Sequence, residues 1–511
     1  MRLLRFCYGP FERPLYLLRY SGDRQDRPMS ESVPLYQQLA SHYRDAIGKG
    51  ALPAGARMPS VRQLMRRHEV SLATALQTLR ALEDHGWLQA RPRVGYFVRP
   101  PALALAEARE PDLRAPIPEA PPGQDGRYVG INERISLMLD AGRRAEIRVD
   151  LGSATPGAEL FDTAAMNRGV TALLREHPQL LTHGRALTGA HPDFQAAMAM
   201  RALEAGVRLA PQDVLATTGN TEAVHLALSA VTQPGDVVAV ESPTYYGLLQ
   251  LIESQGLKAL EIPCSPRSGI SLEALELALA TQPRLKAVIA MPHLQMPLCT
   301  SMSDAAKERL VALCREHDIA LIEDDSYRLL LESAEAPRPA KAWDVSGHVI
   351  YCESFNKTLA PGLRQGWVNG GRWHERIYML KFAQSRSTPA LGQLMAARWT
   401  TAPSFARHLR RLRTHLRSQR ERAAQAIARH FPPGTRLSLP PGGLNLWVEL
   451  PAGASALQLF EQALREGIRL APGSMFSNSG RYDAFVRFGC TLEFDERIDE
   501  AYRTLGRLLR P

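Results

Sequence analysis

SFNKTLAPGLRQGW, residues 354–367, places a lysine after a short apolar run, with a hydroxyl before the lysine and an arginine behind it. The run itself, Val349–Cys352, has the length and composition of a buried strand. Four more such runs precede it, each followed by polar or glycine residues and then by a helical pattern: Val214–Thr218, Val237–Glu241, Ala287–Met291 and Ile319–Glu323. This alternation predicts an α/β sheet covered by helices, with functional groups at the strand ends.

Two other strand ends carry chemically useful residues. Thr218–Glu222 (TGNTE) turns from a strand into a helix, and the free amides of a helix N-terminus favour a phosphate. Glu323–Tyr327 (EDDSY) ends a strand in an acidic pair followed by a phenol. Each signal alone is weak, because a lone lysine is usually a surface residue and acidic strand ends are often solvated. Together they meet the demands of pyridoxal 5′-phosphate (PLP): a lysine that forms an imine, a carboxylate that keeps the pyridine nitrogen protonated, and an anion cup.

Charge is distributed unevenly along the chain. The first 100 residues contain 16 Lys and Arg against eight Asp and Glu, so +8 of the formal net charge of +10 lies in the first fifth. A basic module joined to a nearly neutral remainder indicates a nucleic-acid-binding unit fused to another domain. The 511 residues, 45% hydrophobic and 22% charged, predict a globular protein of two or three domains. No apolar run approaches the roughly 20 residues of a membrane helix, and we expect a soluble protein.

Residues 34–98 predict three short helices and a hairpin. Apolar residues recur every four positions from Leu35 to Ile47, which marks one helix face. A Pro/Gly-rich turn leads to Ser60, which can cap a second helix, and Ser71 can cap a third. Gln89–Val98 reads as two short strands around a basic turn. This order predicts a winged helix-turn-helix, in which a helix N-terminus enters the DNA major groove. The alternative is a small helical domain with an ordinary basic face, and the coincidence of basic wing and turn architecture favours DNA.

The chain divides into four segments on composition. We interpret residues 1–28 as a disordered tail or as an extension ahead of a true start at Met29, and residues 29–99 as the winged helix. The proline-rich stretch 100–130 predicts a semi-extended linker, with a buried arm as the alternative. Residues 131–511 form the body, with a large part over about 150–380 and a small part over about 381–511. Six scattered cysteines without a C-x-x-C pair indicate reduced cytosolic thiols and no metal site.

Several motifs resemble known families over residues 34–511. LPAGARMPSVR (52–62), VSLAT (70–74) and GYFV (95–98) resemble the GntR-type winged helix. QPGDVVAVESPTYYG (233–247), LIEDDSYR (321–328) and APGSMFS (471–477) resemble a fold-type I aminotransferase. The combination is similar to the MocR-type transcriptional regulators. The resemblance implies a multidomain protein, with an N-terminal winged helix-turn-helix and an α/β fold-type I PLP-dependent transferase-like domain, that acts as a cytoplasmic homodimer.

The GntR resemblance also implies which residues contact DNA. The expected contacts, with the basic hairpin included, are Arg57, Ser60, Arg62, Ser71, Thr74, Arg91, Arg93 and Gly95. Leu72 departs from the family pattern, because it replaces the arginine of the recognition helix. One bidentate Arg–base pair contributes about 1–3 kcal/mol of discrimination, and we therefore expect an operator preference different from that of typical relatives.

The aminotransferase resemblance assigns roles around the cofactor. Lys357 becomes the Schiff-base lysine, Asp324 the partner of the pyridine nitrogen and Tyr327 a donor to the phenolic oxygen. Tyr245 would stack on the ring. The phosphate would be held by the amides of Asn220 and Thr221 together with Ser354 and Arg364. Arg487, in FVRFG, fits the arginine that clamps an α-carboxylate, with a surface ion pair as its alternative role.

Four positions depart from the aminotransferase pattern. In MPHLQMPLCTSMS (291–303), Met296 stands where relatives have an asparagine that bonds the phenolic oxygen, and Cys299 stands for a glycine. Asn356 replaces the serine that is usual before the lysine. His183 falls near the position where the family has a tyrosine that reaches the phosphate bound by the partner subunit. Loss of a hydrogen bond to a charged group costs about 1.5–3 kcal/mol. That loss would retune the cofactor without abolishing a covalent imine.

Three functions remain open at this point. The first is a PLP-binding transcriptional regulator that binds operator DNA and senses an amino compound or PLP through Lys357, with vestigial transamination at most. The second is an active PLP-dependent aminotransferase that carries a DNA-binding domain. The third is a DNA-binding protein with a dead pocket, which follows if Met296 and His183 prevent cofactor retention. The altered pocket residues favour the first. The sequence names neither the effector nor the operator.

Overall fold

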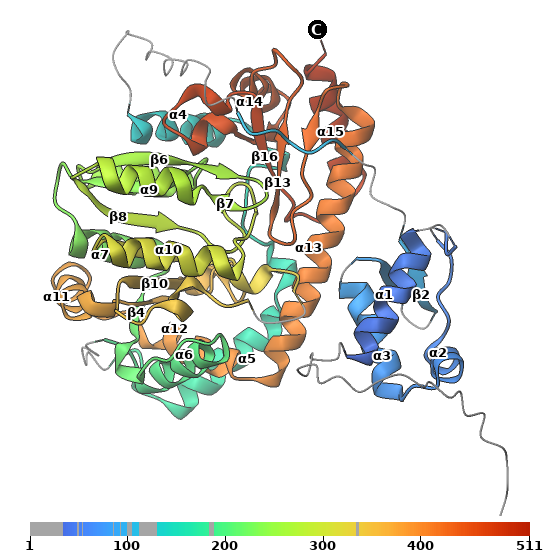
Figure 1. The fold of residues 1–511 in the computed structure, drawn as a ribbon, viewed down its shortest axis with the longest axis horizontal. Coiled ribbons are helices and arrows are strands. Elements are labelled where there is room, and N and C mark those ends of the chain that lie inside the picture. The colour runs from blue at the N-terminus through green and yellow to red at the C-terminus, as the bar shows by residue number, and fades with distance from the viewer. Residues whose placement is uncertain are drawn as a thin grey trace, which may run out of the picture.

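The computed structural model describes residues 34–48, 51–53, 55–84, 86–91, 94–99, 105–111, 130–182, 189–333 and 337–510. The predicted tail (1–28), Arg93 and His183 lie outside these ranges, as does most of the predicted linker. Figure 1 shows a small helical unit beside a larger body, with one long helix of the body, α13 (Pro403–His430), facing the small unit. The predicted order of a winged helix followed by an α/β body is confirmed.

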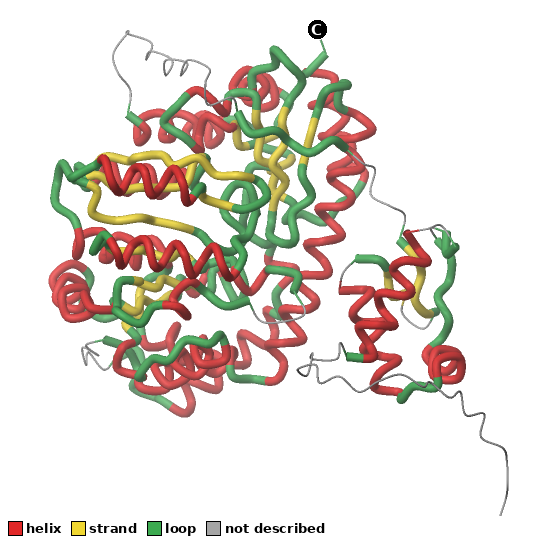
Figure 2. The backbone as a smooth tube through the Cα atoms, in the orientation of Figure 1, coloured by secondary structure: helices red, strands yellow, loops and turns green. Residues whose placement is uncertain are grey.

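The small unit consists of three helices and a hairpin, and Figure 2 shows how they lie beside the body. Its elements are α1 Leu35–Gly48, α2 Val61–His68, α3 Leu72–Asp84, β1 Leu88–Arg91 and β2 Gly95–Val98. Ser60 caps α2, because its hydroxyl accepts the Gln63 N–H at 3.3 Å while the Gln63 side chain accepts the Ser60 N–H at 2.8 Å. At the start of α3 the Ser71 hydroxyl accepts the Thr74 N–H at 3.1 Å. The expected helices, caps and hairpin are confirmed.

An eight-stranded sheet forms the centre of the body, in the order β4-β11-β10-β9-β8-β5-β6-β7. The five strands from β10 to β6 are parallel, whereas β11 is antiparallel to both neighbours and β7 is antiparallel to β6. The bounds are β4 Leu215–Thr217, β5 Val237–Ser242, β6 Lys258–Ser265, β7 Gly269–Ile270, β8 Leu285–Ala290, β9 Ala320–Asp324, β10 Val349–Ser354 and β11 Gly366–Asn369. All five apolar runs singled out in the sequence are strands of this sheet, and the adjacent carboxyl ends of β9 and β10 form one edge.

Helices cover both faces of the sheet. On β5, Val238 and Val240 pack in a core with α7 and α8, whereas Ala239 packs on the opposite face with α9 and α10, as strand alternation requires. The helices of the body are α4 Ile131–Arg144, α5 Thr163–Glu176, α6 Pro192–Glu204, α7 Asn220–Val231, α8 Tyr246–Ser254, α9 Leu272–Thr281, α10 Asp304–Glu316, α11 His374–Gln384, α12 Ala390–Thr400, α13 Pro403–His430, α14 Ala456–Arg465 and α15 Glu496–Leu508. Within the described ranges, none of the helices is long and apolar enough to cross a bilayer.

A second core lies at the C-terminal end of the body. A four-stranded sheet, in the order β12-β13-β16-β15, packs against α14, α15 and the second half of α13. The remaining strands are β3 Val149–Asp150, β12 Arg436–Leu437, β13 Asn445–Glu449, β14 Ile468–Arg469, β15 Ala471–Pro472 and β16 Phe485–Gly489. Short 3₁₀ turns complete the body: η1 Ala158–Leu160, η2 Pro211–Asp213, η3 Arg328–Leu330, η4 Ala340–Trp343, η5 Pro361–Leu363, η6 Gly371–Trp373, η7 Gly473–Phe476 and η8 Gly480–Tyr482. Because α12 packs with α5 and α6 of the large part, the second core begins within α13, later than the predicted division near residue 381.

Residues 105–111 are the described part of the stretch predicted as a linker. Ala108 is buried in the main core, the Ala106 carbonyl accepts the Leu437 N–H at 3.0 Å, and Arg109 pairs with Glu449 at 2.6 Å. The interpretation as a spacer free of the core is wrong for this segment, where the buried-arm alternative holds. Its anchors are partners far along the chain, which local apolar periodicity does not reveal.

Candidate functional site

One cavity, of about 360 Å³, lies at the carboxyl ends of the central strands. All nine residues assigned to the cofactor and effector from the sequence line it: Asn220, Thr221, Tyr245, Asp324, Tyr327, Ser354, Lys357, Arg364 and Arg487. These residues come from five segments of the chain that are far apart in sequence. Their proximity could be predicted from the sequence, because β9 and β10 are neighbouring parallel strands whose ends lie at one edge of the sheet. Helix α7 begins directly after β4 of the same sheet.

The N-terminus of α7 forms one end of the cavity. Gly219 caps this helix with a φ of +85°, and a Cβ there would lie 3.3 Å from both the Arg364 and Asn356 side chains. Glycine is therefore required for the two polar side chains to approach the helix start. The first amides of α7, at Asn220 and Thr221, have no helical acceptor and carry the positive end of the helix dipole. We call Gly219, the amides of Asn220 and Thr221, and Ser354 the phosphate wall.

Lys357 follows β10 and reaches into the centre of the cavity. Its Nζ donates to the Ala154 carbonyl at 2.8 Å and lies 3.3 Å from the Thr155 hydroxyl. Burial, together with the neighbouring guanidinium groups of Arg487 and Arg364, lowers the pKa of Lys357 to about 8. The lowered pKa makes a larger fraction of Lys357 neutral near physiological pH than of an ordinary lysine, and the neutral amine is the form that reacts with an aldehyde.

Asp324 is the last residue of β9 and lines the same cavity as Lys357. It is 5% exposed, and its carboxylate accepts the Ser326 N–H at 3.1 Å. Burial raises the pKa of Asp324 to about 6, a sign that this carboxylate would gain from a cationic partner. Tyr327 is also buried, with its ring centroid 6.0 Å from the Lys357 Nζ. On the other wall the Tyr245 ring lies 4.8 Å from the Tyr246 ring, and only a glycine at position 247 leaves room for it.

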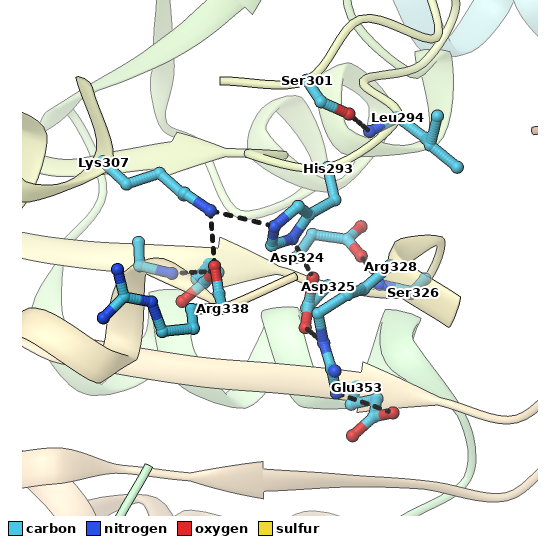
Figure 3. A network of polar contacts seen from close by, with 12 residues as sticks. His293, Leu294, Ser301, Lys307, Asp324, Asp325, Ser326, Arg328, Arg338 and Glu353 are labelled. Atoms are coloured by element: carbon cyan, nitrogen blue, oxygen red, sulfur yellow. Dashed lines mark hydrogen bonds and ion pairs between the residues drawn. The ribbon is translucent and has the colours of Figure 1, made fainter. Parts of the chain in front are cut away.

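A buried polar network fixes the end of β9 from behind, as Figure 3 shows. Asp325 points away from the cavity, where it accepts from His293 at 2.8 Å, from Arg328 at 2.5 Å and from the Tyr351 hydroxyl at 2.6 Å. These partners lower the pKa of Asp325 despite its burial. Adjacent residues of one strand end thus have separate roles: Asp325 anchors the backbone, and Asp324 faces the cavity.

The same network contains three donor groups at metal-ligand spacing, His293, Glu323 and Asp325. Glu323 is already bonded, because it accepts two backbone N–H groups, from Ala340 at 2.7 Å and from Lys341 at 2.8 Å. The Nζ of Lys307 lies 3.2 Å from Nε2 of His293, the ring nitrogen that does not bond Asp325. A cation would therefore displace existing hydrogen bonds beside an ammonium group, and we interpret the cluster as structural.

Arg487, on β16, closes the cavity on the side of the second core. It is 3% exposed, donates through Nη2 to the Gly152 carbonyl, and lies 5.3 Å from the centroid of the Phe476 ring. No carboxylate of the described residues lies within ion-pair distance of it, and its Nε has no partner. The alternative role as a surface ion pair is therefore excluded by its burial. A buried guanidinium with a free donor is suited to a carboxylate ligand.

The polar atoms left without partners test whether these residues fit PLP. Among the described side chains, Asn220 Oδ1, Asn356 Oδ1 and Arg487 Nε are buried and unbonded, and all three belong to the lining of this cavity. Unbonded buried polar atoms are costly unless a ligand satisfies them. The amine of Lys357, the amides of the phosphate wall and the carboxylate of Asp324 match the aldehyde, phosphate and ring nitrogen of PLP. The residues present fit the group.

Two of the replaced positions, Met296 and Cys299, lie in residues 291–303, which we call the loop wall. Met296 is buried, lines the cavity and presents a thioether in place of an amide. Cys299 has a φ of +54°, the left-handed conformation that glycine favours. Behind both residues, the Asn445 Nδ2 lies 3.3 Å from the Met296 sulfur and 3.0 Å from the Cys299 sulfur. Cys299 thus keeps a glycine-like backbone conformation, whereas the side chain at position 296 differs in chemistry from the expected asparagine.

Sequence reasoning missed a group of cavity residues that lie outside the motifs. They are Met138, Ser153, Ala154, Thr155 and Arg469. Met138 comes from α4, and Arg469 pairs with Asp150 through Nε at 2.9 Å across the β3–β14 ladder. No local signal identifies them, because α4 and β3 reach the cavity only through tertiary packing.

The predicted DNA contacts lie on the surface of the winged helix. Arg57, Ser60, Arg62 and Ser71 are exposed, and Thr74 is half-buried. A surface depression next to the start of α2 is lined by Arg57, Met58, Pro59, Ser60, Gln63, Arg66 and Arg67. Arg66 and Arg67 were not singled out from the sequence, although they form a basic pair in the last turn of α2. This surface is suited to DNA phosphates.

The predicted wing residues lie around the β1–β2 hairpin. Arg57 donates to the Val94 carbonyl at 2.6 Å, so it also holds the turn of the wing. Gly95 has a φ of +126°, and the Arg57 guanidinium packs against its open side. Arg91 lies in β1, where the structure describes only its backbone. Leu72, at the first position of α3, is 54% exposed, where it could contact bases.

Comparison with known proteins finds two families in this chain. Residues 35–98 match the bacterial regulatory proteins of the gntR family, and residues 163–505 match aminotransferase class I and II. The chain is 36% identical over 475 residues to the Uncharacterized HTH-type transcriptional regulator YdcR of Escherichia coli. This match covers 93% of this chain and 99% of YdcR. It is 27% identical to the Probable rhizopine catabolism regulatory protein MocR of Rhizobium meliloti, with 86% of each chain covered.

A solved structure resembles the body. LysN, the alpha-aminoadipate aminotransferase from Thermus thermophilus, crystallised with N-(5′-phosphopyridoxyl)-L-leucine, is 30% identical to this chain, with a TM-score of 0.65. The match covers 73% of this chain and 94% of LysN. The predicted fold class, a winged helix-turn-helix with a fold-type I transferase-like domain, is thereby confirmed, and so is PLP as the cofactor of this fold.

Proposed function

Because the chain belongs to the MocR-type regulators, which join a GntR-type winged helix to an aminotransferase domain, we propose that its body senses PLP or an amino compound through Lys357 and thereby changes how the winged helix binds operator DNA. One observation carries the proposal: a winged helix and a cofactor-sized cavity occur in the same chain. The cavity has the lysine and the phosphate wall expected for PLP, but its loop wall has Met296 in place of the expected asparagine. A protein in this state would retain the cofactor without the full set of groups that transamination uses. We further propose a cytoplasmic homodimer.

Each cavity residue has a role in this proposal. Bound PLP supplies an aldehyde that reacts with amines and a ring that withdraws electrons. Lys357 would hold the aldehyde through its neutral amine, and the phosphate wall with Arg364 would bind the phosphate. Asp324 would hold a proton on the ring nitrogen, and that cationic partner would offset the cost of burying its carboxylate. Tyr327 would donate to the phenolic oxygen, and Tyr245 would stack on the ring.

Arg487 gives the effector its expected chemistry. Its unbonded Nε and buried guanidinium favour a ligand with a carboxylate. The nearby Lys357 amine favours a ligand whose own amine competes for the same aldehyde. We therefore propose a small amino compound with a carboxylate as the effector.

An active aminotransferase remains the second candidate. It is favoured by one observation: Lys357, Asp324 and Arg487 all line the cavity, as proton transfer on an amino acid would require. The loop wall counts against it, because Met296 cannot donate a hydrogen bond to the phenolic oxygen. Steady turnover of an amino donor with a keto acid would establish the enzyme.

A DNA footprint tests the proposed regulator. Purified protein is bound to the DNA that flanks its own gene, with and without PLP, in the wild type and in Lys357→Ala. We expect a protected operator whose extent or midpoint of protection changes with PLP in the wild type only. Absence of protection on all flanking DNA would contradict a regulator of nearby promoters. Equal responses to PLP in both proteins would exclude sensing through Lys357.

A further inference from the structure

Helix α13 lies between the rest of the body and the winged helix (Figure 1), and its side chains bond to both. The residues concerned are spaced as one helical stripe, at positions i, i+4, i+7 and i+8: Arg413, Arg417, Arg420 and Glu421. Arg417, Arg420 and Glu421 make side-chain contacts whose partners no motif in the sequence predicts.

Toward the cavity, the stripe holds the segment that continues from Tyr327. This segment is η3 and the two residues after it, ending at Glu332. Arg413 donates to the Leu329 carbonyl at 2.7 Å, and Arg417 Nε bonds the Glu332 carboxylate at 2.6 Å. Arg420 binds the other oxygen of the same carboxylate. Only four residues thus separate Tyr327, which lines the cavity, from the Glu332 carboxylate that is held on α13.

Toward the winged helix, the same Arg417 guanidinium uses its second nitrogen. Its Nη1 donates to the backbone carbonyl of Glu83, in the last turn of α3. The Glu83 carboxylate accepts the Ala90 N–H of β1 at 3.1 Å, so the contact continues into the wing. One further ion pair, Arg99 with Glu421 at 2.6 Å, holds the end of the hairpin on α13. Only Arg417 among the described residues bonds both Glu332 and the winged helix.

We propose that Arg417 is the positioning residue that couples the cavity to the winged helix, through Glu332 on one side and the Glu83 carbonyl on the other. The inference deepens the proposed function and depends on it. The guanidinium is planar, and its side chain is 9% exposed. A shift of Glu332 therefore turns the whole group and must stretch or release its bond to Glu83.

The coupling is directional in its consequences. The contact lies at the C-terminal end of α3, so Ser71 and Leu72, at the DNA-reading start of the helix, stay free in the docked position. Release of Arg417 would alter the tilt of α3 and the wing without touching a DNA contact. Allosteric couplings of this kind commonly change affinity about 5- to 150-fold.

Hydrogen–deuterium exchange on the full-length protein tests the link without knowledge of the operator. Exchange is compared with and without PLP, whose binding is verified by absorbance. In the wild type we expect PLP to change exchange both in the segment after Tyr327 and in the last turn of α3 with β1. In Arg417→Ala and in Glu332→Gln we expect the first change to persist and the second to disappear.

Arg422→Ala is the matched control. Arg422 lies on the same helix and donates to the Phe494 carbonyl at 2.8 Å, away from the winged helix, so the control should behave as the wild type. Glu332→Gln is nearly isosteric, and it carries the test if Arg417→Ala fails to fold. A response of α3 that survives in both variants would overturn the inference, as would a wild type that binds PLP without any change in α3. Failure of the wild type to bind PLP would instead refute the proposed function.

Discussion

The two walls of the cavity differ in how far they keep the chemistry expected of them. The phosphate wall keeps every group: the glycine at 219, the free amides of α7, Ser354 and the adjacent Arg364. The loop wall has a left-handed conformation at Cys299, where a glycine is expected, and carries a thioether at position 296, where an amide is expected. Retention of the cofactor depends on the first wall and electronic tuning of its ring on the second. If the proposed roles hold, the difference implies that retention of the cofactor and catalysis depend on separate groups of this cavity.

Lys357, the proposed covalent anchor of PLP, lines the same cavity, and its removal should have the largest effect. We expect Lys357→Ala to weaken PLP binding at least about 100-fold, or about 2.7 kcal/mol, because only hydrogen bonds and stacking would remain. The measurement is a titration that follows the absorbance of bound PLP. Lys286→Ala, at an exposed lysine on β8, is the control and should leave binding unchanged. Unchanged binding in Lys357→Ala would exclude this lysine as the anchor.

The phosphate wall should show the next largest effect. Arg364 has a φ of +49°, and asparagine tolerates this conformation, so Arg364→Asn removes the charge with little backbone strain. Loss of a charged hydrogen bond of about 1.5–3 kcal/mol predicts about 10- to 100-fold weaker PLP binding. Pyridoxal without the phosphate should be nearly indifferent to the substitution. Arg376→Asn, at an exposed position of α11, is the control. An equal loss for pyridoxal and PLP would contradict a phosphate role.

Local chemistry made much of the fold and site predictable. Ser60 caps α2 through its own chain neighbours, and five apolar runs are strands because their composition alone favours burial. Lys357 and Asp324 could be paired because each follows a parallel strand, and the ends of such strands share one edge of the sheet. For the cap and the strands the cause lies within the segment itself, and for the pair it lies in the general rule that parallel strands end at one edge.

The rest depends on contacts between distant segments. Ser153 and Met138 reach the cavity because β3 pairs with β14 and α4 packs on α8, and neither pairing has a sequence signature. Ala108 was taken as part of a spacer because its neighbours are polar, yet ion pairs such as Arg109 with Glu449 hold that segment in place. Arg417 is one of many arginines on α13, and only its two partners distinguish it.

Restoration of the loop wall tests the comparison from the other side. We expect Met296→Asn to tighten PLP binding by up to about tenfold, because an amide can donate to the phenolic oxygen, offset by the cost of burying it in the empty pocket. A shift in the absorbance maximum of the bound cofactor would accompany the change. Met296→Leu conserves volume without a donor and is the control. Weaker binding in the asparagine variant would show that the two walls no longer match.

The smallest effect is in the pH dependence of cofactor uptake, which reports the charge that both walls place around Lys357. Burial, Arg487 and Arg364 lower the pKa of Lys357 to about 8, so the neutral amine is the minority below that pH and the majority above it. The uptake rate of the apoprotein, followed by absorbance, should rise about fivefold from pH 7 to pH 8 and level off above about pH 9. Arg487→Gln removes one of the causes and should move the rise to higher pH. A rate that climbs without a plateau to pH 10 in the wild type would mean an ordinary lysine, and would remove the electrostatic link between Lys357 and the groups that surround it.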